Sequence, residues 1–346
     1  MQSQQQKTTI ITGGTGLLGS HLLYELSKKG NNIIALKRPA SSLSLTEKIF
    51  QWRKNNSQSN FQKIHWVDGD ITDIDSLLKI FEKGSEVYHA AGKVSFNGKD
   101  RNRLFDINIK GTANVVNAAL EKGVSKLCFV SSIAAIGRSS NNNLTSEETP
   151  WDNTAKTSLY AESKYEAEHE IWRGIAEGLP AVIVNPSIIL GPGNWDKSSA
   201  RLFSNVYKGL KFYTKGTNGY VAADDLAKIM IALMESDVES QRFIINSENI
   251  SYQQLFTWIA ESLHVEPPKY LAGPILSETV WRILKLASLF TGKTPLITRE
   301  TAQTANSNYY YSNEKIILQT GFHFKPIKET IKETAEFFLQ DLNRVT

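Results

Sequence analysis

The chain has 346 residues, of which 41% are hydrophobic and 10% aromatic, enough to bury the core of one large domain or two smaller ones. Its formal net charge is only +4, and no Lys- and Arg-rich stripe interleaved with aromatic residues indicates a nucleic-acid partner. The single cysteine, Cys128, excludes an internal disulfide and fits a reducing compartment. The polar start lacks a signal-peptide core, and no run approaches the ~18 apolar residues of a membrane span, so we expect a cytoplasmic protein without a membrane segment.

The stretch from Thr8 to His21 combines an apolar run rich in β-branched residues, three spaced glycines and the start of a helical pattern. This order of strand, glycine turn and helix is the one that a dinucleotide-binding turn requires. Gly13 lets the chain leave the strand sharply, and Gly16 has no Cβ to keep a pyrophosphate away from the backbone. Gly19 lets the helix pack close to the sheet, while the N-terminus of that helix faces the phosphates.

The first half of the chain alternates apolar runs with helical patterns. We expect strands at 8–12, 32–36, 64–67, 86–91, 126–132, 181–185 and 242–246, with helices at 17–29, from about 73, at 103–122 and at 157–177. This alternation predicts right-handed βαβ units and a Rossmann-type, doubly wound parallel sheet of about seven strands.

The alternation breaks after Pro186. A turn and a helix at 199–208 begin what we expect to be a smaller, mostly helical substrate region, whereas the helix from Asp224 and the last strand return to the main domain. The apolar run 280–290 is expected to form a buried helix or the wall of an apolar substrate pocket, and 55–60 and 139–143 are expected to be surface loops. The predicted dinucleotide-binding domain is 7–185 with 215–247, and the predicted substrate region is 186–214 with 248–340.

A tyrosine followed four residues later by a lysine is a candidate proton-donor pair, because an ammonium group stabilises phenolate and lowers the tyrosine pKa. The chain contains four such pairs, Tyr24/Lys28, Tyr160/Lys164, Tyr207/Lys211 and Tyr311/Lys315. Only Tyr160/Lys164 follows the fifth strand, which ends in Ser131-Ser132, and begins a helix. Ligands bind beyond the carboxyl ends of parallel strands, so this pair and the two serines are expected at the same crevice.

Several short motifs occur together in one order. They are Thr12-Gly13-Gly14-Thr15-Gly16-Leu17-Leu18-Gly19, Asp68-Gly69-Asp70-Ile71, His89-Ala90-Ala91-Gly92, Asn108-Ile109-Lys110-Gly111-Thr112, Val130-Ser131-Ser132, Tyr160-Ala161-Glu162-Ser163-Lys164 and Asn185-Pro186-Ser187 with Gly191-Pro192-Gly193. Over roughly residues 8–250 the sequence resembles an extended short-chain dehydrogenase/reductase of the NAD-dependent epimerase/dehydratase superfamily. It is most similar to the dihydroflavonol and cinnamoyl-CoA reductase branch.

The resemblance implies a catalytic set. Ser132, five residues before Gly137 as in the family pattern, would bond the substrate oxygen, with Ser131 as the alternative. Tyr160 would transfer the proton, and Lys164 would lower the tyrosine pKa and hold the nicotinamide ribose. Asn108 would support the site or a proton relay, with a plain polar helix residue as the less favoured alternative.

The resemblance also implies a coenzyme site, in which Asp70 and Ile71 bracket the adenine and His89 is structural. The predicted coenzyme-binding residues are Gly13, Thr15, Gly16, Leu17, Leu18, Gly19, Lys37, Arg38, Asp70, Ile71, Ala90, Ala91, Gly92, Asn108, Tyr160, Lys164, Pro186 and Ser187, and no metal ligand is assigned. An NAD site needs an acid after the second strand. Here Lys37 and Arg38 occupy that place, which favours the 2′-phosphate of NADP(H) over NAD(H).

We therefore predict an NADPH-dependent oxidoreductase that reduces a ketone or aldehyde, or oxidises the alcohol. Ile133 and Ala134 replace the Asp-Glu pair of the related dehydratases, and the apolar run 280–290 suits a small-molecule substrate with an apolar portion. The alternatives are a nucleotide-sugar epimerase using bound NAD, for which Arg201, Arg282 or Arg299 could clamp a diphosphate, and a non-catalytic NADP(H)-binding regulator. A homodimer is expected only by analogy with the family.

Overall fold

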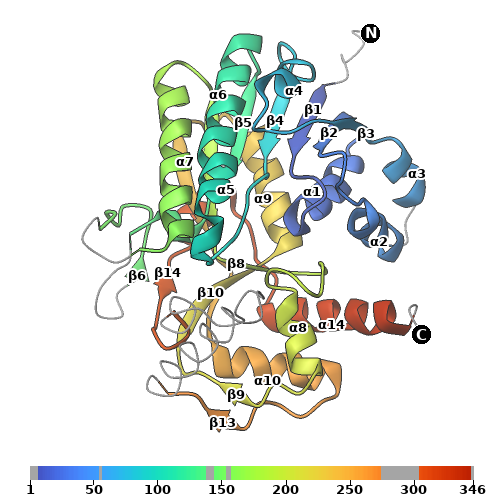
Figure 1. Cartoon of the computed structure of the whole chain (residues 1–346), viewed down its shortest axis with the longest axis vertical. Coiled ribbons are helices and arrows are strands. Elements are labelled where there is room, and N and C mark those ends of the chain that lie inside the picture. Colours follow the sequence, from blue (N-terminus) through green and yellow to red (C-terminus); the bar gives the residue numbers. More distant parts are fainter. Residues whose placement is uncertain (1–6, 54–56, 138–143, 153–156, 274–303, 344–346) are drawn as a thin grey trace.

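A seven-stranded sheet lies at the centre of the larger part of the molecule (Figure 1). The computed structural model describes residues 7–53, 57–137, 144–152, 157–273 and 304–343. In sheet order the strands are β11 (Gln241–Ile245), β7 (Ala181–Pro186), β5 (Lys126–Val130), β4 (Glu86–His89), β1 (Thr8–Thr12), β2 (Asn32–Lys37) and β3 (His65–Asp68). Every neighbouring pair is parallel, which confirms the predicted Rossmann-type sheet.

The chain crosses from one side of β1 to the other between β3 and β4. β2 and β3 lie on one side of β1, and β4, β5, β7 and β11 lie on the other. In sheets of this kind the ligand crevice lies beyond the carboxyl ends of the strands at this switch, which here are β1 and β4. β4 and β5 end two residues earlier than predicted, at His89 and Val130, and the residues that follow form the loops above the crevice.

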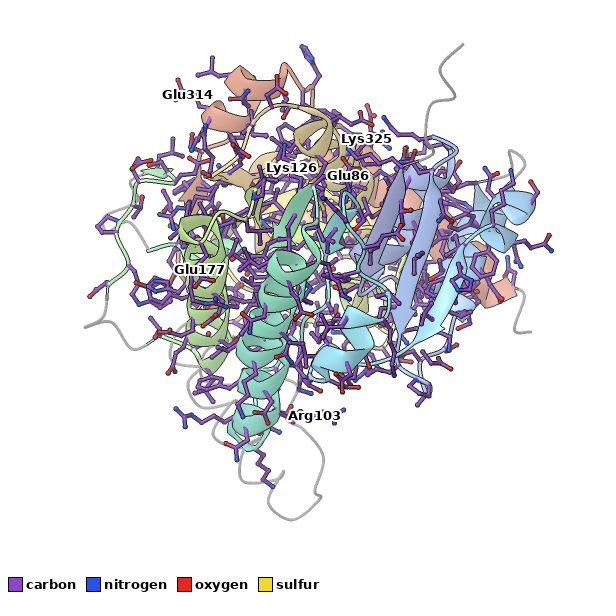
Figure 2. The ribbon with its side chains drawn as sticks, turned by 90° about the horizontal axis from the view of Figure 1, so that it is seen from above. Glu86, Arg103, Lys126, Glu177, Glu314 and Lys325 are labelled. Carbon is purple, nitrogen blue, oxygen red and sulfur yellow. The ribbon has the colours of Figure 1, made fainter. Side chains whose placement is uncertain are left out.

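Helices cover both faces of the sheet. On β4, Val87 packs with α4 (Ile74–Leu78), α6 (Gly111–Lys122) and α7 (Leu159–Ala176), whereas Tyr88 packs with α1 (Leu17–Ser27) and α9 (Ala223–Glu235). Strands buried on both sides read as continuous apolar runs, which is why the sequence revealed them. Figure 2 shows α6 along the sheet, with Glu86 and Lys126 near one end and Arg103 at the other. Glu86 and Lys126 begin β4 and β5, so the Arg103 end is the carboxyl edge that carries the crevice.

The long helix predicted at 103–122 is interrupted. It begins earlier, as α5 (Arg101–Phe105), passes through a π-helical turn, η2 (Asp106–Lys110), and continues as α6. Wide turns of this kind are rare and frequently occur at functional sites. The turn contains Asn108, one of the predicted site residues.

Two helices between β2 and β3 were not predicted, α2 (Ser44–Trp52) and α3 (Ser57–Gln62). The prediction of a loop at 55–60 is therefore wrong for 57–60. Phe61 packs edge-to-face on Phe50 with ring centroids 5.5 Å apart, and this long-range contact overrides the weak helix preference of Asn and Ser. The predicted loop at 139–143 and the apolar run 280–290 lie outside the described residues.

The smaller part of the molecule is mostly helical, as predicted, and also contains short strands. A mixed sheet, ordered β12 (Glu248–Ser251), β10 (Thr217–Ala222) and β8 (Ile188–Leu190), packs with α8 (Arg201–Tyr207), α10 (Tyr252–Leu263) and α14 (Ile327–Asn343). The remaining elements are α13 (Glu314–Thr320) and two small parallel pairs, β9 (Phe212–Tyr213) with β13 (Tyr270–Leu271) and β6 (Leu144–Thr145) with β14 (Tyr310–Tyr311). Within the described ranges, no helix combines the length and apolarity needed to cross a bilayer.

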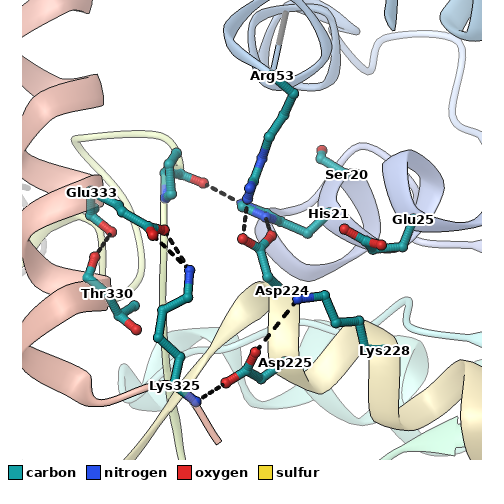
Figure 3. A network of polar contacts seen from close by, with 12 residues as sticks. Ser20, His21, Glu25, Arg53, Asp224, Asp225, Lys228, Lys325, Thr330 and Glu333 are labelled. Carbon is teal, nitrogen blue, oxygen red and sulfur yellow. Dashed lines mark hydrogen bonds and ion pairs between the residues drawn. The ribbon is translucent and has the colours of Figure 1, made fainter. Parts of the chain in front are cut away.

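A buried polar network joins the two parts (Figure 3). Asp224, at the start of α9, lies 2.5 Å from His21 Nδ1 on α1 and pairs with Arg53, and His21 Nε2 lies 3.2 Å from the carbonyl oxygen of Pro192. Burial alone would raise the pKa of Asp224, but the charges and hydrogen bonds of His21 and Arg53 hold it well below its usual range. The carboxylate therefore links α1, α2 and α9 with the loop after β8.

We expect Asp224→Asn to lower the free energy of unfolding in urea by about 3–5 kcal/mol, because it leaves Arg53 and His21 without their buried counter-charge. The matched control is Glu235→Gln at the other end of α9, which breaks the exposed pair with Lys29 and is expected to cost less than about 1 kcal/mol. Equal losses in the two variants would show that the network does not stabilise the junction.

Candidate active site

The turn between β1 and α1 is packed so closely that two of its glycines admit no side chain. Gly13 has φ +81°, and a Cβ there would lie 2.5 Å from the backbone nitrogen of Ala91. A Cβ on Gly19 would lie 2.1 Å from the Gly13 oxygen, so α1 rests directly on the turn. Gly16 is exposed, and a Cβ there would meet its nearest atom only at 3.4 Å. The turn therefore presents bare backbone at Gly16, where a pyrophosphate would approach.

The first turn of α1 faces the same opening. Gly16 is its N-cap residue and supplies no side-chain cap, so the first N–H groups of the helix remain available to an anion. Thr15 and Leu17 are half-buried beside it, whereas the side chain of Leu18 packs in the core and leaves only backbone for a ligand. These groups fit the phosphates of a dinucleotide.

The carboxyl end of β2 is basic. Lys37 forms an ion pair with Asp68, the last residue of β3. Arg38 is exposed, and its guanidinium has no hydrogen-bond or ion-pair partner among the described residues. The structure therefore separates the two predicted basic residues, since Lys37 is neutralised and Arg38 is available.

Asp70 and Ile71 lie in the turn that follows β3. Asp70 Oδ1 accepts hydrogen bonds from the Thr72 backbone nitrogen at 3.0 Å and hydroxyl at 2.9 Å, as a turn residue does. The Ile71 side chain lies against Gly111, where a Cβ would come within 2.7 Å of it. Both residues border the crevice on the Arg38 side of β1, because β2 and β3 lie there.

His89 ends β4 and is fully buried. Its Nδ1 lies 2.7 Å from the Thr12 hydroxyl and its Nε2 3.0 Å from the Thr112 hydroxyl. Burial and the nearby charge of Lys164 lower the pKa of His89 to about 3, so the ring is neutral near pH 7. This arrangement supports the predicted structural role.

Asn108 holds the loop after β4 to helix α7. Its Oδ1 accepts from the Lys93 backbone nitrogen at 2.7 Å, and its Nδ2 donates to the Lys93 oxygen at 3.0 Å and to the Ser163 hydroxyl at 2.9 Å. The loop from Ala90 to Gly92 thus lies above the Gly13 turn, fixed from the π-helical turn. The amide is 2% exposed and fully bonded, so it supports the site rather than facing solvent.

The two serines after β5 face different partners. The Ser131 hydroxyl donates to Glu168 Oε2 at 2.7 Å, whereas the Ser132 hydroxyl lies beside Tyr160 and acts to lower its pKa. Ser132 also caps the short helix after it by accepting from the Ala134 nitrogen at 3.1 Å. The geometry therefore favours Ser132, with Tyr160, as the pair that can meet a substrate oxygen.

Lys164 lies one helical turn after Tyr160 and is 5% exposed. Its Nζ donates to the Val130 oxygen at 2.8 Å and lies 4.3 Å from the centre of the Phe129 ring. Burial lowers the pKa of Lys164 to about 7, although the carboxylate of Glu168 acts in the opposite direction. The amine therefore changes charge in the neutral range.

The pKa of Tyr160 corrects a prediction. Burial raises it above its ordinary value, and the hydrogen bond from Ser132 offsets only part of that rise. Lys164 does not lower it here, because its ammonium group bonds the Val130 carbonyl instead of the phenol. Tyr160 is thus fully protonated near pH 7, the state a proton donor needs.

Pro186 and Ser187 lie at and just beyond the carboxyl end of β7. Pro186 is the last residue of the strand, and Ser187 is buried, with its hydroxyl 3.3 Å from the Ile245 oxygen of β11. Their predicted contact with a coenzyme would therefore use backbone or require the Ser187 hydroxyl to leave that bond.

The buried polar residues around Glu168 were not predicted from the sequence. Its carboxylate accepts from Asn185 Nδ2 at 2.8 Å and from Arg242 Nη1 at 3.1 Å, in addition to Ser131. The sequence does indicate that Glu168 lies near Lys164, because it follows Lys164 by four residues and so shares the same face of the helix. Arg242 gave no such signal, because β11 brings it there from 74 residues away.

A glycine turn at the first crossover, beside a Ser, Tyr and Lys cluster at the carboxyl edge, defines a dinucleotide-dependent oxidoreductase of Rossmann type. The model of the NAD dependent epimerase/dehydratase family matches residues 9–246, so the chain belongs to that family. The resemblance identified from the motifs is thereby confirmed.

Two relatives are similar over most of the chain. Sterol demethylase protein B of Methylococcus capsulatus is 25% identical over 79% of this chain and 80% of its own length. Cinnamoyl-CoA reductase 1 of Petunia hybrida is 22% identical over 97% of this chain and 93% of its own. With these relatives, the protein is classed as an NAD(P)-dependent oxidoreductase.

Solved structures share the whole fold. The crystal structure of gox2253 is 26% identical and has a TM-score of 0.80, covering 97% of this chain and 98% of its own. A UDP-glucose 4-epimerase from Thermotoga maritima, solved with UDP-glucose, is 20% identical with a TM-score of 0.75, covering 97% and 99%. At this identity the second likeness concerns the fold alone.

We expect Gly16→Ala to separate folding from coenzyme binding. The residue has φ −84°, and its nearest neighbour to a new Cβ is at 3.4 Å, so the thermal midpoint is expected to stay within a few degrees of the parent. The methyl group would occupy the pyrophosphate position, so NADPH affinity in a fluorescence titration should fall at least about tenfold, or ~1.4 kcal/mol. Gly273→Ala, which meets no atom within 4 Å, is the control. Unchanged affinity in Gly16→Ala would place the phosphates elsewhere.

Proposed function

We propose that the chain is an NADPH-dependent carbonyl reductase that uses Tyr160 as proton donor. The observation that carries this proposal is the placement of the Ser132 hydroxyl, which lowers the pKa of Tyr160, beside that phenol and the buried amine of Lys164. All three lie at the carboxyl edge of β5, next to the crevice that begins at the Gly13 turn.

The residues of the chain divide the work at the substrate oxygen. Ser132 donates a hydrogen bond that orients and polarises the carbonyl, and Tyr160 gives its proton to the oxygen as negative charge develops there. Lys164, held by the Val130 oxygen, supplies a donor for the nicotinamide ribose. When bound, NADPH supplies the hydride. The same groups acting in reverse would oxidise an alcohol.

The basic end of β2 supports NADPH as the coenzyme. Arg38 is exposed and unpaired within the described structure, so it is free to meet a 2′-phosphate. No carboxylate lies in residues 35–39 to bond a 2′-hydroxyl, and the nearby Asp68 is already paired with Lys37.

Apolar side chains beside Tyr160 support a substrate with an aromatic or aliphatic portion. Phe96 packs edge-to-face on the Tyr160 ring at 5.7 Å and is 39% exposed, and Val94 on the same loop is 56% exposed. We assign the coenzyme to 7–185 with 215–247, except for β10, which pairs with β8 and β12 in the smaller sheet, and the remainder of the substrate to 186–214 and 248–340. The names of the sterol and cinnamoyl-CoA relatives agree with an apolar substrate.

Replacing Arg38 by Ser should weaken NADPH binding at least about tenfold and leave NADH binding within about twofold, since a charged hydrogen bond to phosphate is worth ~1.5–3 kcal/mol. Both affinities are measured by fluorescence titration. Lys332→Ser, which removes an exposed charge on α14, controls for net charge. A parent protein that binds NADH as tightly as NADPH would contradict the coenzyme assignment.

Tyr160→Phe should lower kcat for NADPH-dependent carbonyl reduction by about 100-fold or more while changing the NADPH Kd less than about threefold, because only the proton donor is lost. The control is Tyr24→Phe, from a Tyr/Lys pair with the same spacing on α1, which should keep full activity. Unaltered turnover in Tyr160→Phe would remove this residue from the chemistry. Interconversion of a nucleotide sugar without net NADPH oxidation would instead establish an epimerase.

A further inference from the structure

We propose that Glu168 is a positioning residue of the active site, which fixes the Ser131–Ser132 turn and balances the charge of Lys164. The inference rests on the proposed function for the meaning of that site, but its geometry is independent of any substrate. Glu168 lies on α7, one turn beyond Lys164 and two turns beyond Tyr160, and its carboxylate is 2% exposed.

The carboxylate of Glu168 accepts hydrogen bonds from residues on β7 and β11 and from Ser131, which directly follows β5. Its Oε2 accepts from Ser131 Oγ at 2.7 Å, just beyond β5, and from Asn185 Nδ2 at 2.8 Å on β7. Its Oε1 accepts from Arg242 Nη1 at 3.1 Å on β11. A buried carboxylate is tolerated only with such a full set of partners, so these bonds are specific to this place.

The same bonds reach the reacting groups. Asn185 Nδ2 donates not only to Glu168 but also to the Ser132 carbonyl oxygen, at 3.0 Å. Glu168 therefore holds the Ser131 side chain directly and the Ser132 carbonyl through Asn185, and the Ser132 hydroxyl lies beside Tyr160. Loss of Glu168 would free Ser131 and Asn185 and loosen the geometry between Ser132 and Tyr160.

Glu168 also provides negative charge beside Lys164. The charged group that acts on Lys164 is Glu168 on its own helix, which is itself paired with the guanidinium of Arg242 on β11, whereas the His89 ring on β4 is neutral and Tyr160 on α7 is protonated. β5 contributes only the Val130 carbonyl and the Phe129 ring. Glu168 is thus the charge that favours the ammonium form.

The sign of the effect follows from the pKa of Lys164, which burial lowers to about 7 against the opposing charge of Glu168. Without that carboxylate the pKa falls further, and a larger share of the amine is neutral near pH 7. Without the Arg242 guanidinium, Glu168 is less neutralised and one repelling cation is gone, so the pKa of Lys164 rises. The two partners of one ion pair therefore shift Lys164 in opposite directions.

The test measures Lys164 directly, by NMR titration of the lysine ¹³Cε resonances, with the Lys164 signal assigned by its absence in Lys164→Arg. Glu168→Gln should lower the Lys164 titration midpoint by about one pH unit, and Arg242→Gln should raise it. Glu170→Gln, which breaks a half-buried pair with Arg173 on the same helix, should leave it in place. In carbonyl reduction, the alkaline limb of kcat/KM should move in the same direction as the midpoint in each variant.

A midpoint that does not move in Glu168→Gln, or that moves in the same direction in both variants, would overturn the proposal. If Glu168→Gln fails to fold, Glu168→Asp takes its place, because the shorter side chain keeps the charge but withdraws it from Lys164, so the midpoint should still fall, by less than about one unit. The titration needs no substrate, so a protein that shows these shifts but reduces no carbonyl compound would refute the proposed function and not the role of Glu168.

Discussion

One face of helix α7 determines the site, because Tyr160, Lys164 and Glu168 follow one another at intervals of four residues against the end of β5. This spacing places a phenol, an amine and a carboxylate one above the next along the helix. The sheet supplies their partners, which are the Val130 carbonyl, the two serines after β5, and Asn185 from β7. The chemistry therefore depends on the packing of one helix on the strand edge.

The ionisable groups buried in the site are either neutral or paired with an opposite charge. His89, in contact with two hydroxyls, is neutral, whereas Glu168 is buried with Arg242 as its counter-charge. Lys164 is intermediate, because its pKa is about 7 and both its neutral and its charged form are populated near pH 7. An amine poised in this way responds to small changes in its surroundings, which is useful where a proton must be given up and regained.

The sequence allowed the sheet and much of the site to be predicted, because strands buried on both faces are continuous apolar runs and the glycine turn has a fixed spacing. The features that could not be predicted depend on contacts between residues that are separated in the sequence. The helix at Ser57–Gln62 depends on Phe61 packing on Phe50, and β10 reads poorly as a strand until β8 and β12 pair with it. The raised pKa of Tyr160 likewise reflects its burial. Lys164 donates to the Val130 carbonyl, a contact that no local sequence pattern predicts.

Transfer of deuterium tests the central claim most directly. The protein is incubated with NADPH deuterated on both positions of the nicotinamide C4 and with a panel of apolar ketones and aldehydes together with UDP-sugars, and the products are analysed by mass spectrometry. The proposed reduction predicts one deuterium bound to the new carbinol carbon of an apolar carbonyl compound, with one NADPH consumed for each product. An isomerised UDP-sugar without deuterium and without loss of NADPH would contradict it.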